Sequence, residues 1–277
     1  MPILHAIVLG LVQGFTEFLP ISSSGHLLLV PWLFGWNDFE SSSVEKAFDV
    51  SLHIGTLFAV VGYFRHDIST YVRAGTRQLV KRERPATDEA RLAWLLVLAT
   101  VPAALIGAVF SDVIDENLGT PLIIAISLIV FGLLLAWADR RQGSRPIEDM
   151  RTRDALIVGA AQALALNPGT SRSGITMTAA RFIGFNREAA VRISFLMSIP
   201  IIVGAVVFEV GGLIKDGIPE GLLIPMIVGI IASALSGLLA VWGTLTIVKT
   251  YSFMPFVIYR IGLGVFILIV LATGWRS

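Results

Sequence analysis

The chain has 277 residues, of which 55% are hydrophobic and only 15% are charged. A soluble domain of this size carries more charge, so the composition excludes an ordinary soluble protein and indicates a single integral membrane domain over residues 1–277. The absence of cysteine excludes disulfides, thiolate chemistry and cysteine-based metal sites, and the formal net charge of +1 points to no partner by itself.

The first apolar region, residues 1–36, is interrupted after Pro20 by the polar turn Ser22-Ser23-Ser24-Gly25-His26. The limb that follows the turn, residues 26–36, is about 16 Å long as a helix, whereas the hydrocarbon core of a bilayer is about 30 Å thick. The pattern therefore favours a re-entrant helix–turn–helix hairpin that enters the membrane and returns to the same side. A broken but complete span is the alternative.

Six later stretches are long enough and apolar enough to span a bilayer. They are residues 47–64, 92–110, 121–138, 193–212, 222–248 and 255–274. The loops 65–91 and 139–153 are rich in Arg and Lys, while the loop 111–120 between them has acidic residues and no basic one. The positive-inside rule places the two basic loops in the cytoplasm, so both termini are expected outside.

A second interrupted region, residues 154–186, contains the turn Pro168-Gly169-Thr170-Ser171-Arg172-Ser173-Gly174. Its limb after the turn is again too short to span, so we expect a second re-entrant hairpin. The two halves then share one plan. Residues 1–138 form a first repeat with hairpin 1–36 and three spans, and residues 154–277 form a second repeat with hairpin 154–186 and three spans.

Three spans is an odd number, so the second repeat is inverted relative to the first. Identical residues at a fixed offset of 149 support the repeat; they include Ser22 and Ser171, Ser24 and Ser173, Gly25 and Gly174, and Gly35 and Gly184. The predicted fold is an all-α polytopic membrane protein with six transmembrane helices and two re-entrant hairpins in an inverted-topology repeat. Many secondary transporters share this plan.

In such a plan the tips of the two hairpins meet near the middle of the membrane. Each tip precedes a helix, so its backbone N–H groups and the positive helix end point toward the meeting place and suit a phosphate. Hydroxyls add neutral donors, glycines allow close approach, and Arg172 adds a charged bidentate donor. The residues expected to bind the substrate are Ser22, Ser24, Gly25, Gly169, Thr170, Ser171, Ser173, Gly174 and Thr176.

Gln13 and Glu17 are spaced to share one helical face that points toward the first tip. A lone carboxylate at membrane depth is costly, so Glu17 is expected to hold a divalent cation or to pair with His26 or Arg172. Oxygen ligands from Glu17 and Gln13 suit Mg²⁺ or Ca²⁺. Ser23 lies one helical turn before His26, as a nucleophile and its base would.

The expected catalytic residues are thus Glu17, Ser23, His26 and Arg172, and the expected metal ligands are Glu17 and Gln13. Two other pairs are ambiguous. Asp49 and His53 either line the site or form an interfacial pair, and Arg260 is expected to be neutralised by Glu209 rather than to serve the site.

At these motifs the chain resembles the undecaprenyl pyrophosphate phosphatase family, also called the bacitracin-resistance protein family. The resemblance rests on Gln13-x-x-x-Glu17, Ser22–His26, Pro168–Gly174 and the run 48–56, and it covers essentially the whole chain. Gln13 is an allowed alternative to Glu at the first position of the family pattern, and it supplies only a neutral ligand.

The resemblance implies an enzyme of the bacterial cytoplasmic (inner) membrane that removes the terminal phosphate of undecaprenyl pyrophosphate. This reaction recycles the lipid carrier for peptidoglycan synthesis and confers bacitracin resistance. The family further implies a site that opens toward the outer face and a supporting divalent cation. The expected partners are a polyprenyl pyrophosphate and membrane lipids, with no nucleic acid; a homodimer stays open.

The sequence leaves open whether Ser23, His26 or water attacks the phosphorus. A polyprenyl-phosphate transporter or flippase, alone or in addition, is the main alternative, because inverted repeats are common in transporters. A phosphatidic-acid type of lipid phosphatase needs a His after the Ser-Arg motif, and all four His precede Arg172. A non-catalytic receptor would leave the polar tips unexplained.

Overall fold

The structure of the protein is a computed structural model that describes residues 1–81, 87–216 and 220–276, except for the side chains of residues 110–117 and 208–216. The regular elements of this part are helices, as predicted for an all-α protein. In chain order they are α1 (Ile3–Phe18), α2 (Ser23–Phe34), α3 (Ser42–Tyr63), α4 (Arg65–Lys81), α5 (Asp88–Leu98), α6 (Val101–Asn117), α7 (Pro121–Asp139), η1 (Ile147–Asp149), α8 (Thr152–Ala163), η2 (Leu164–Leu166), α9 (Arg172–Phe182), α10 (Arg187–Asp216), α11 (Leu223–Thr250) and α12 (Met254–Thr273).

Both interrupted regions are helix–turn–helix hairpins, as the sequence predicts. In the first, α1 ends at Phe18 ahead of Pro20, and α2 begins at Ser23. In the second, α8 and the short η2 precede a turn of five residues, 167–171, after which α9 begins. The apolar sequence is therefore broken at the Pro, Ser and Gly residues that cannot continue a helix.

Five of the described helical segments are long and apolar enough to cross a membrane, and the bent pair of α3 and α4 makes up to six. The five are Asp88–Val109, Pro121–Asp139, Arg187–Val207, Leu223–Thr250 and Met254–Thr273. Each overlaps a predicted span, and α3 overlaps the remaining one. The chain is a multi-pass helical membrane protein.

The predicted loop 65–91 is corrected by the structure, because much of it is helical. The helix α4 follows α3 directly and is bent by 84° from it. Ile68 and Tyr71 of α4 pack against the hydrophobic core, while Arg73 on the same helix is exposed. The basic residues that indicate a cytoplasmic segment thus belong to an amphipathic helix, which charge counting alone does not distinguish from a loop.

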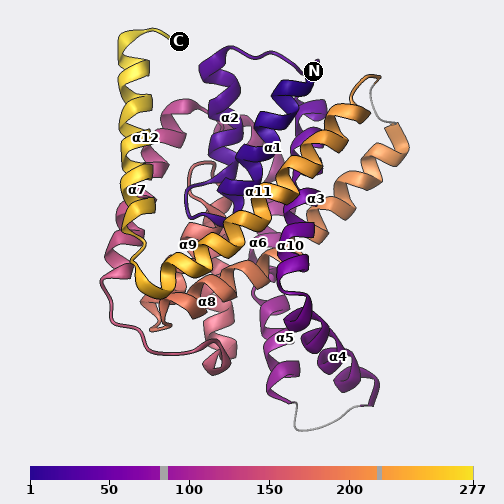
Figure 1. Ribbon diagram of the computed structural model, residues 1–277, viewed down its shortest axis with the longest axis vertical. Coiled ribbons are helices and arrows are strands. Elements are labelled where there is room, and N and C mark those ends of the chain that lie inside the picture. The colour runs from indigo at the N-terminus through magenta and orange to yellow at the C-terminus, as the bar shows by residue number, and fades with distance from the viewer. Residues whose placement is uncertain (82–86, 217–219, 277) are drawn as a thin grey trace.

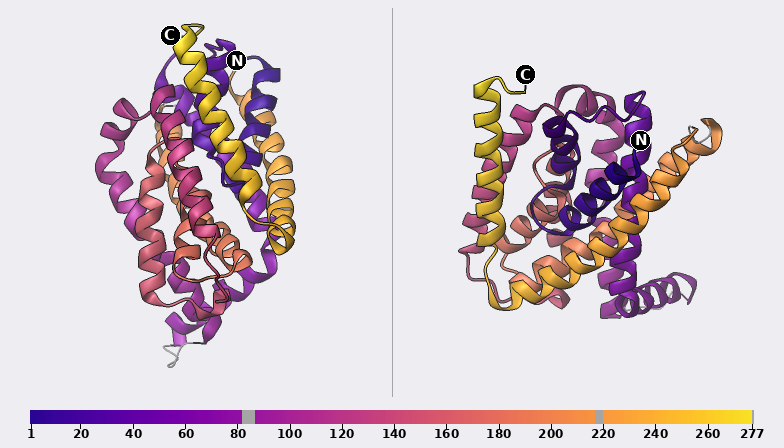
Figure 2. Two further views of the ribbon diagram at one scale, coloured as in Figure 1. Left: turned by 90° about the vertical axis from the view of Figure 1, so that its left-hand side faces the viewer. Right: turned by 45° about the horizontal axis from the view of Figure 1, so that its top comes forward.

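The two hairpins lie between two groups of longer helices (Figure 1). On one side α12 packs along α7; on the other, α11 packs against α1 and α3. The first hairpin contacts α11 through α1, and the second contacts α7 and α10 through α9. Both chain termini lie at one end of the molecule, and the α4–α5 pair projects at the opposite end (Figures 1 and 2).

Small residues let α1 approach α11 closely. A Cβ atom on Gly10 would lie 2.5 Å from the carbonyl oxygen of Gly229, and one on Gly14 would lie 2.4 Å from that of Ser233. Such contacts are too short for any larger residue, so these glycines bring the helix backbones together, as small residues commonly do in membranes. This packing fixes the helix that carries Gln13 and Glu17.

Candidate active site

The tips of the two hairpins meet, as the sequence predicts. The backbone N–H of Gly169 donates to Ser22 Oγ at 3.1 Å, and Ser173 Oγ donates to the carbonyl oxygen of Leu19 at 3.0 Å. A Cβ atom on Gly25 would lie 3.3 Å from Gly169 Cα, so the glycine allows the two turns to touch. Residues almost 150 positions apart therefore form one structure.

Each tip is built around a serine with an unusual backbone. Ser22 and Ser171 have φ values of 82° and 72°, and they are the two non-glycine residues with positive φ in the part of the chain that is described. Each serine caps the following helix, and its Oγ accepts from the N–H of Gly25 at 3.3 Å or of Gly174 at 3.1 Å. A left-handed non-glycine residue costs about 1–3 kcal/mol, so the surrounding contacts must hold both turns in this shape.

Arg260 of α12 is the main contact that holds the turns. Its side chain is fully buried and donates to Pro20 O at 3.2 Å, Gly169 O at 3.0 Å and Thr170 O at 2.9 Å. A fourth bond runs from Nε to Leu128 O of α7 at 3.2 Å. The guanidinium therefore satisfies turn carbonyls from both hairpins at once, which the apolar surroundings cannot do.

This placement differs from the sequence expectation for Arg260. The expected partner, Glu209, has a side chain outside the described residues, and the observed partners are backbone carbonyls. A charged residue in an apolar span was the available signal, but the sequence does not show that unwound turns would lie beside it.

Glu17 lies buried at the end of α1, at the junction of the two tips. Its Oε1 accepts from Arg172 Nη2 at 2.8 Å, and its Oε2 accepts from Ser23 Oγ at 2.6 Å and from Gln13 Nε2 at 3.3 Å. His53 Nε2 of α3 lies 3.7 Å from the same Oε2. One carboxylate from the first hairpin thus pairs with the arginine of the second, and His53 lies at the site rather than in an interfacial pair.

Arg172 is oriented from both sides. While Nη2 contacts Glu17, Nη1 donates to the carbonyl oxygen of Ser194 on α10 at 2.7 Å. Its side chain is 15% exposed, so it is accessible yet held in place. A guanidinium at the first position of α9 also stands beside the positive end of that helix, where an anion is favoured.

His26 has a different set of partners from the one proposed for a Ser23–His26 pair. Its Nδ1 contacts Ser22 O at 2.6 Å, and its Nε2 contacts Tyr259 OH at 2.8 Å. A carbonyl oxygen only accepts, so Nδ1 carries a proton and donates it to Ser22 O, while Nε2 faces the Tyr259 hydroxyl. Ser23 Oγ donates to Glu17 Oε2 instead, so the structure does not pair Ser23 with His26.

Most of the hydroxyls predicted to bind substrate are used to build the tips. Thr170 Oγ1 accepts from Asn167 at 3.2 Å, and Thr176 Oγ1 donates to Arg172 O at 2.8 Å. Ser24 differs, since it is exposed and makes no side-chain hydrogen bond to the residues that are described. The N–H groups of Gly25, Gly169 and Gly174 are also occupied, by serine hydroxyls. The first amides of α2 and α9, Ser24 and Arg172 are consequently the groups most available to a ligand.

Gln13 offers an oxygen to a hard cation. The side chain is fully buried, and its Oε1 has no hydrogen-bond partner among the described residues. Carboxamide and carboxylate oxygens are ligands that suit Mg²⁺ or Ca²⁺ when phosphate oxygens and water complete the shell. Groups of three or more His, Asp or Glu that could hold a metal by themselves are absent from the described chain. Glu17 and Gln13 therefore fit a cation that the substrate helps to bind.

An apolar groove of about 420 Å³ runs between α1 and α12 and ends at the first tip. Nearly all of its surroundings are apolar, with His26 and Tyr259 at the polar end. The lining residues include Leu11, Phe15, Leu19, Ile21, Phe256 and Tyr259. The groove has the shape and the chemistry to take a hydrocarbon chain whose head group lies at the tips.

Comparison with known proteins agrees with these features. The family described as "Bacitracin resistance protein BacA" matches residues 6–266. A relative named "Undecaprenyl-diphosphatase" from Geobacter sulfurreducens is 47% identical over 95% of this chain and 96% of its own. Relatives with the same name from Campylobacter curvus and Nocardioides are 46% and 45% identical, over 98% of this chain in each case and 99% and 97% of their own. The chain belongs to the bacitracin-resistance protein BacA family.

Proposed function

We propose that the protein hydrolyses undecaprenyl pyrophosphate to undecaprenyl phosphate and inorganic phosphate at the junction of the two hairpin tips. The names of full-length relatives support this reaction. The observation that carries it is the contact at 2.8 Å between Glu17 and Arg172, which joins an acid and a phosphate-binding cation from different hairpins. Such a site recycles the lipid carrier for cell-wall synthesis, and bacitracin resistance follows from that recycling.

The substrate fits this junction with its head group at the tips and its tail in the groove. The terminal phosphate would face Arg172 and the amides at the start of α9, where charge and helix dipole favour an anion. The polyprenyl chain would leave between α1 and α12, since the groove there is apolar and ends at His26. His26 would then stand beside the phosphate that remains on the lipid.

Ser23 is the nucleophile in this proposal, with Glu17 as its base. Their contact at 2.6 Å supports the assignment. When the substrate draws Arg172 onto its phosphate, Glu17 Oε2, which already accepts the hydrogen bond from Ser23 Oγ, takes the Ser23 proton. The bond from Ser23 Oγ to the terminal phosphorus forms, the bond to the bridging oxygen breaks, and undecaprenyl phosphate leaves with that oxygen and its electron pair.

Water completes the cycle. It attacks the phosphoserine phosphorus, the Oγ–P bond breaks, and the proton held by Glu17 returns to Ser23. Inorganic phosphate leaves with the water oxygen, and the second water proton passes to solvent. Arg172 stabilises charge on the transferring phosphoryl group in both steps, which is the main task in such chemistry.

A divalent cation, Mg²⁺ or Ca²⁺, would be held by Glu17 and Gln13 and would supply positive charge against the phosphates. The buried, unpartnered Oε1 of Gln13 supports this assignment. The residues of the chain still perform the positioning, because Arg172 and the tip amides are fixed without it.

We also propose that the site opens to the outer side of the cytoplasmic membrane and that the two hairpins are inverted repeats. The first hairpin starts and ends on the face that carries both termini (Figure 1), which the positive-inside rule assigns to the outside. Equivalent residues also have equivalent packing. A Cβ atom on Gly10 or on its counterpart Gly159 would strike a backbone carbonyl, of Gly229 or Ala99 respectively.

Release of inorganic phosphate from undecaprenyl pyrophosphate by the purified protein in detergent tests the proposal. We expect turnover that falls when a chelator removes divalent cations and returns when Mg²⁺ or Ca²⁺ is added. Protein that binds the lipid and releases no phosphate under any of these conditions would refute hydrolysis and favour transport alone.

A further inference from the structure

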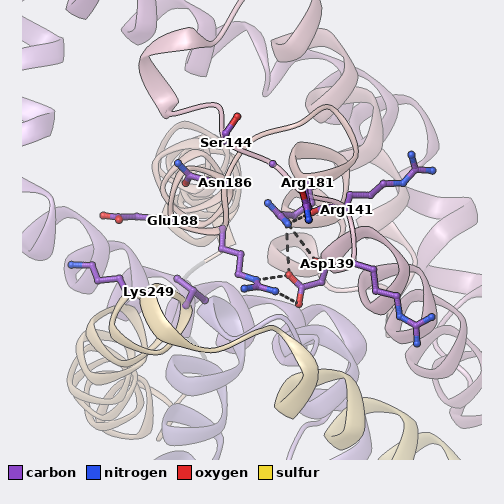
Figure 3. Close-up of a pocket in the computed structure, with 12 residues that line it drawn as sticks. Asp139, Arg141, Ser144, Arg181, Asn186, Glu188 and Lys249 are labelled. Carbon is purple, nitrogen blue, oxygen red and sulfur yellow. Dashed lines mark hydrogen bonds and ion pairs between the residues drawn. The ribbon is translucent and has the colours of Figure 1, made fainter.

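A large basic cavity lies away from the tips, where α7 and α11 end and α10 begins (Figure 3). Its volume is about 970 Å³, and five basic and two acidic side chains line it. The helix α9 connects the two places. Arg172 begins this helix at the tips, and Arg181, in its last turn, lies at the cavity, about 14 Å away along the axis. The positive-inside rule places this cavity on the cytoplasmic face.

One of the two acids is already neutralised. Asp139 is buried and accepts from Arg187 at 2.6 Å and 3.1 Å, and its Oδ2 also accepts from the N–H of Phe253 at 3.0 Å. These bonds tie the ends of α7, α10 and the α11–α12 connection together. Asp139 is thus part of the wall, and it leaves little negative charge for the remaining cations.

Of the remaining cations, Arg181 has a longer ion-pair contact, 3.8 Å from its Nε to Asp139 Oδ1, and the other three have no carboxylate partner among the described residues. Arg140 and Lys249 are exposed side chains without an ion pair to any described residue. Arg141 lies against aromatic rings, 5.7 Å from the centre of the Trp137 ring. The second acid, Glu188, lies in the first turn of α10. The cavity therefore carries a surplus of positive charge that the protein does not balance.

The wall of the cavity is rigid. Arg181 is 4% exposed and donates to Phe185 O at 2.6 Å and to the carbonyl oxygens of Asp139 and Arg141, while its Nε has no hydrogen-bond partner among the described residues. The loop after α7 is fastened by Arg145, whose backbone N–H donates to Gly184 O at 3.1 Å. The positive-inside rule accounts for basic residues on this face, but it does not account for the hydrogen bonds that hold the cavity wall in place.

We infer that this cytoplasmic cavity is a second anion site, which binds a phosphate monoester. Arg140, Arg141 and Lys249 supply the charge, and the start of α10 lines the same cavity, where the helix dipole favours an anion. A phosphate-bearing lipid head group and free inorganic phosphate offer the same chemistry to these residues. The site is independent of the hydrolysis proposed at the tips.

Calorimetric titration of the purified protein in neutral detergent tests this inference, with dioctanoyl phosphatidic acid and inorganic phosphate as separate probes. An Arg172→Ala background removes the strongest competing anion ligand at the tips. In that background we expect Arg140→Ala/Lys249→Ala to weaken binding of at least one probe by about tenfold or more. The matched control Arg73→Ala/Lys81→Ala removes two exposed cations from α4 and should change affinity by less than about twofold.

The two probes separate the sources. Loss of binding for the lipid alone identifies a head-group site, and loss for both identifies a site for free phosphate as well. The inference is overturned if neither probe binds the Arg172→Ala protein, or if the cavity variant and the α4 variant bind alike. Phosphate release by Arg140→Ala/Lys249→Ala in the otherwise unchanged protein should stay within about twofold of wild type, so failure here leaves the hydrolysis proposal intact.

Discussion

The two hairpin tips have one backbone design and different chemistry. At the offset of 149 residues Ser22 matches Ser171 and Gly25 matches Gly174, and both caps have a positive φ and an equivalent hydrogen bond. The side chains between and around them differ. Ser23 matches Arg172, His26 matches Ile175, and Glu17 matches Leu166.

The comparison shows that the shared residues form the turn, whereas the unshared residues supply the reactive groups. The first tip provides the carboxylate, the hydroxyl and the imidazole, and the second provides the guanidinium. Neither tip is sufficient by itself for phosphoryl transfer in the proposed mechanism. Substitution of an unshared residue should therefore remove activity, and substitution of a shared residue should reduce the stability of the protein.

The largest effect is expected for the cation of the second tip. Arg172→Ala should lower kcat by about 10³-fold, because the developing charge on the phosphoryl group loses its main donor. Phosphate release from undecaprenyl pyrophosphate measures it. Arg73→Ala on α4 is the control and should keep nearly full turnover. An Arg172→Ala enzyme with more than a tenth of wild-type kcat would show that the second tip is not catalytic.

The counterpart of Arg172 in the first tip is Ser23. Ser23→Ala should lower kcat by about 10²-fold or more, since the nucleophile is removed while the Glu17–Arg172 pair remains. Trapping of a phosphoserine on rapid acid quench measures the intermediate directly. Ser43→Ala, at the exposed start of α3, is the matched control. Nearly full turnover of Ser23→Ala would instead favour water or His26 as the attacking group.

Arg260 holds both tips, so its loss should affect stability more than any single turn residue. Arg260→Ala leaves four carbonyl groups without their donor in an apolar region, and it should lower the free energy of unfolding by about 3 kcal/mol or more. Thermal unfolding in detergent gives the change in Tm. Arg153→Ala, an exposed arginine on α8, should leave Tm unchanged. Equal Tm values for the two variants would contradict the inference that Arg260 holds the two tips together.

The smallest effects separate the two shared glycines. A Cβ atom on Gly174 would lie 2.7 Å from Arg260 Nη1, whereas the nearest atom to a Cβ on Gly25 is 3.2 Å away. Gly174→Ala should therefore destabilise the protein by about 1–3 kcal/mol and Gly25→Ala by less. The same thermal measurement ranks them. A lower Tm for Gly25→Ala than for Gly174→Ala would show that the first tip is the tighter one.

The sequence predicts the helices and the tips well because interruptions are local. Pro20 and the Ser-Gly runs break apolar segments at fixed places, and the structure has its turns there. It predicts less about what surrounds the tips. Arg260 is about 90 residues beyond Thr170, and no local pattern shows that the guanidinium would reach the turn carbonyls.

The same limit explains the other differences. Ser23 and His26 are one turn apart, but the N-cap carbonyl of Ser22 and the distant Tyr259 take the His26 nitrogens. The helix α4 is bent by 84° from α3 and packs against the core. The number of basic residues in this segment gives no information about that packing. Helix interruptions can be predicted from local sequence, whereas contacts between residues that are distant in the sequence can be identified only from the folded structure.

A double-mutant cycle on Glu17 and Arg172 tests most directly whether the two hairpins form one catalytic site. Phosphate release should be measured for wild type, Glu17→Gln, Arg172→Ala and the double variant, with undecaprenyl pyrophosphate as substrate. If the two hairpins form one catalytic unit, each single variant loses about 10²-fold or more and the double variant is hardly worse than the weaker single variant. Losses that multiply in the double variant would mean that the two residues act independently, and the account of a joint site would be wrong.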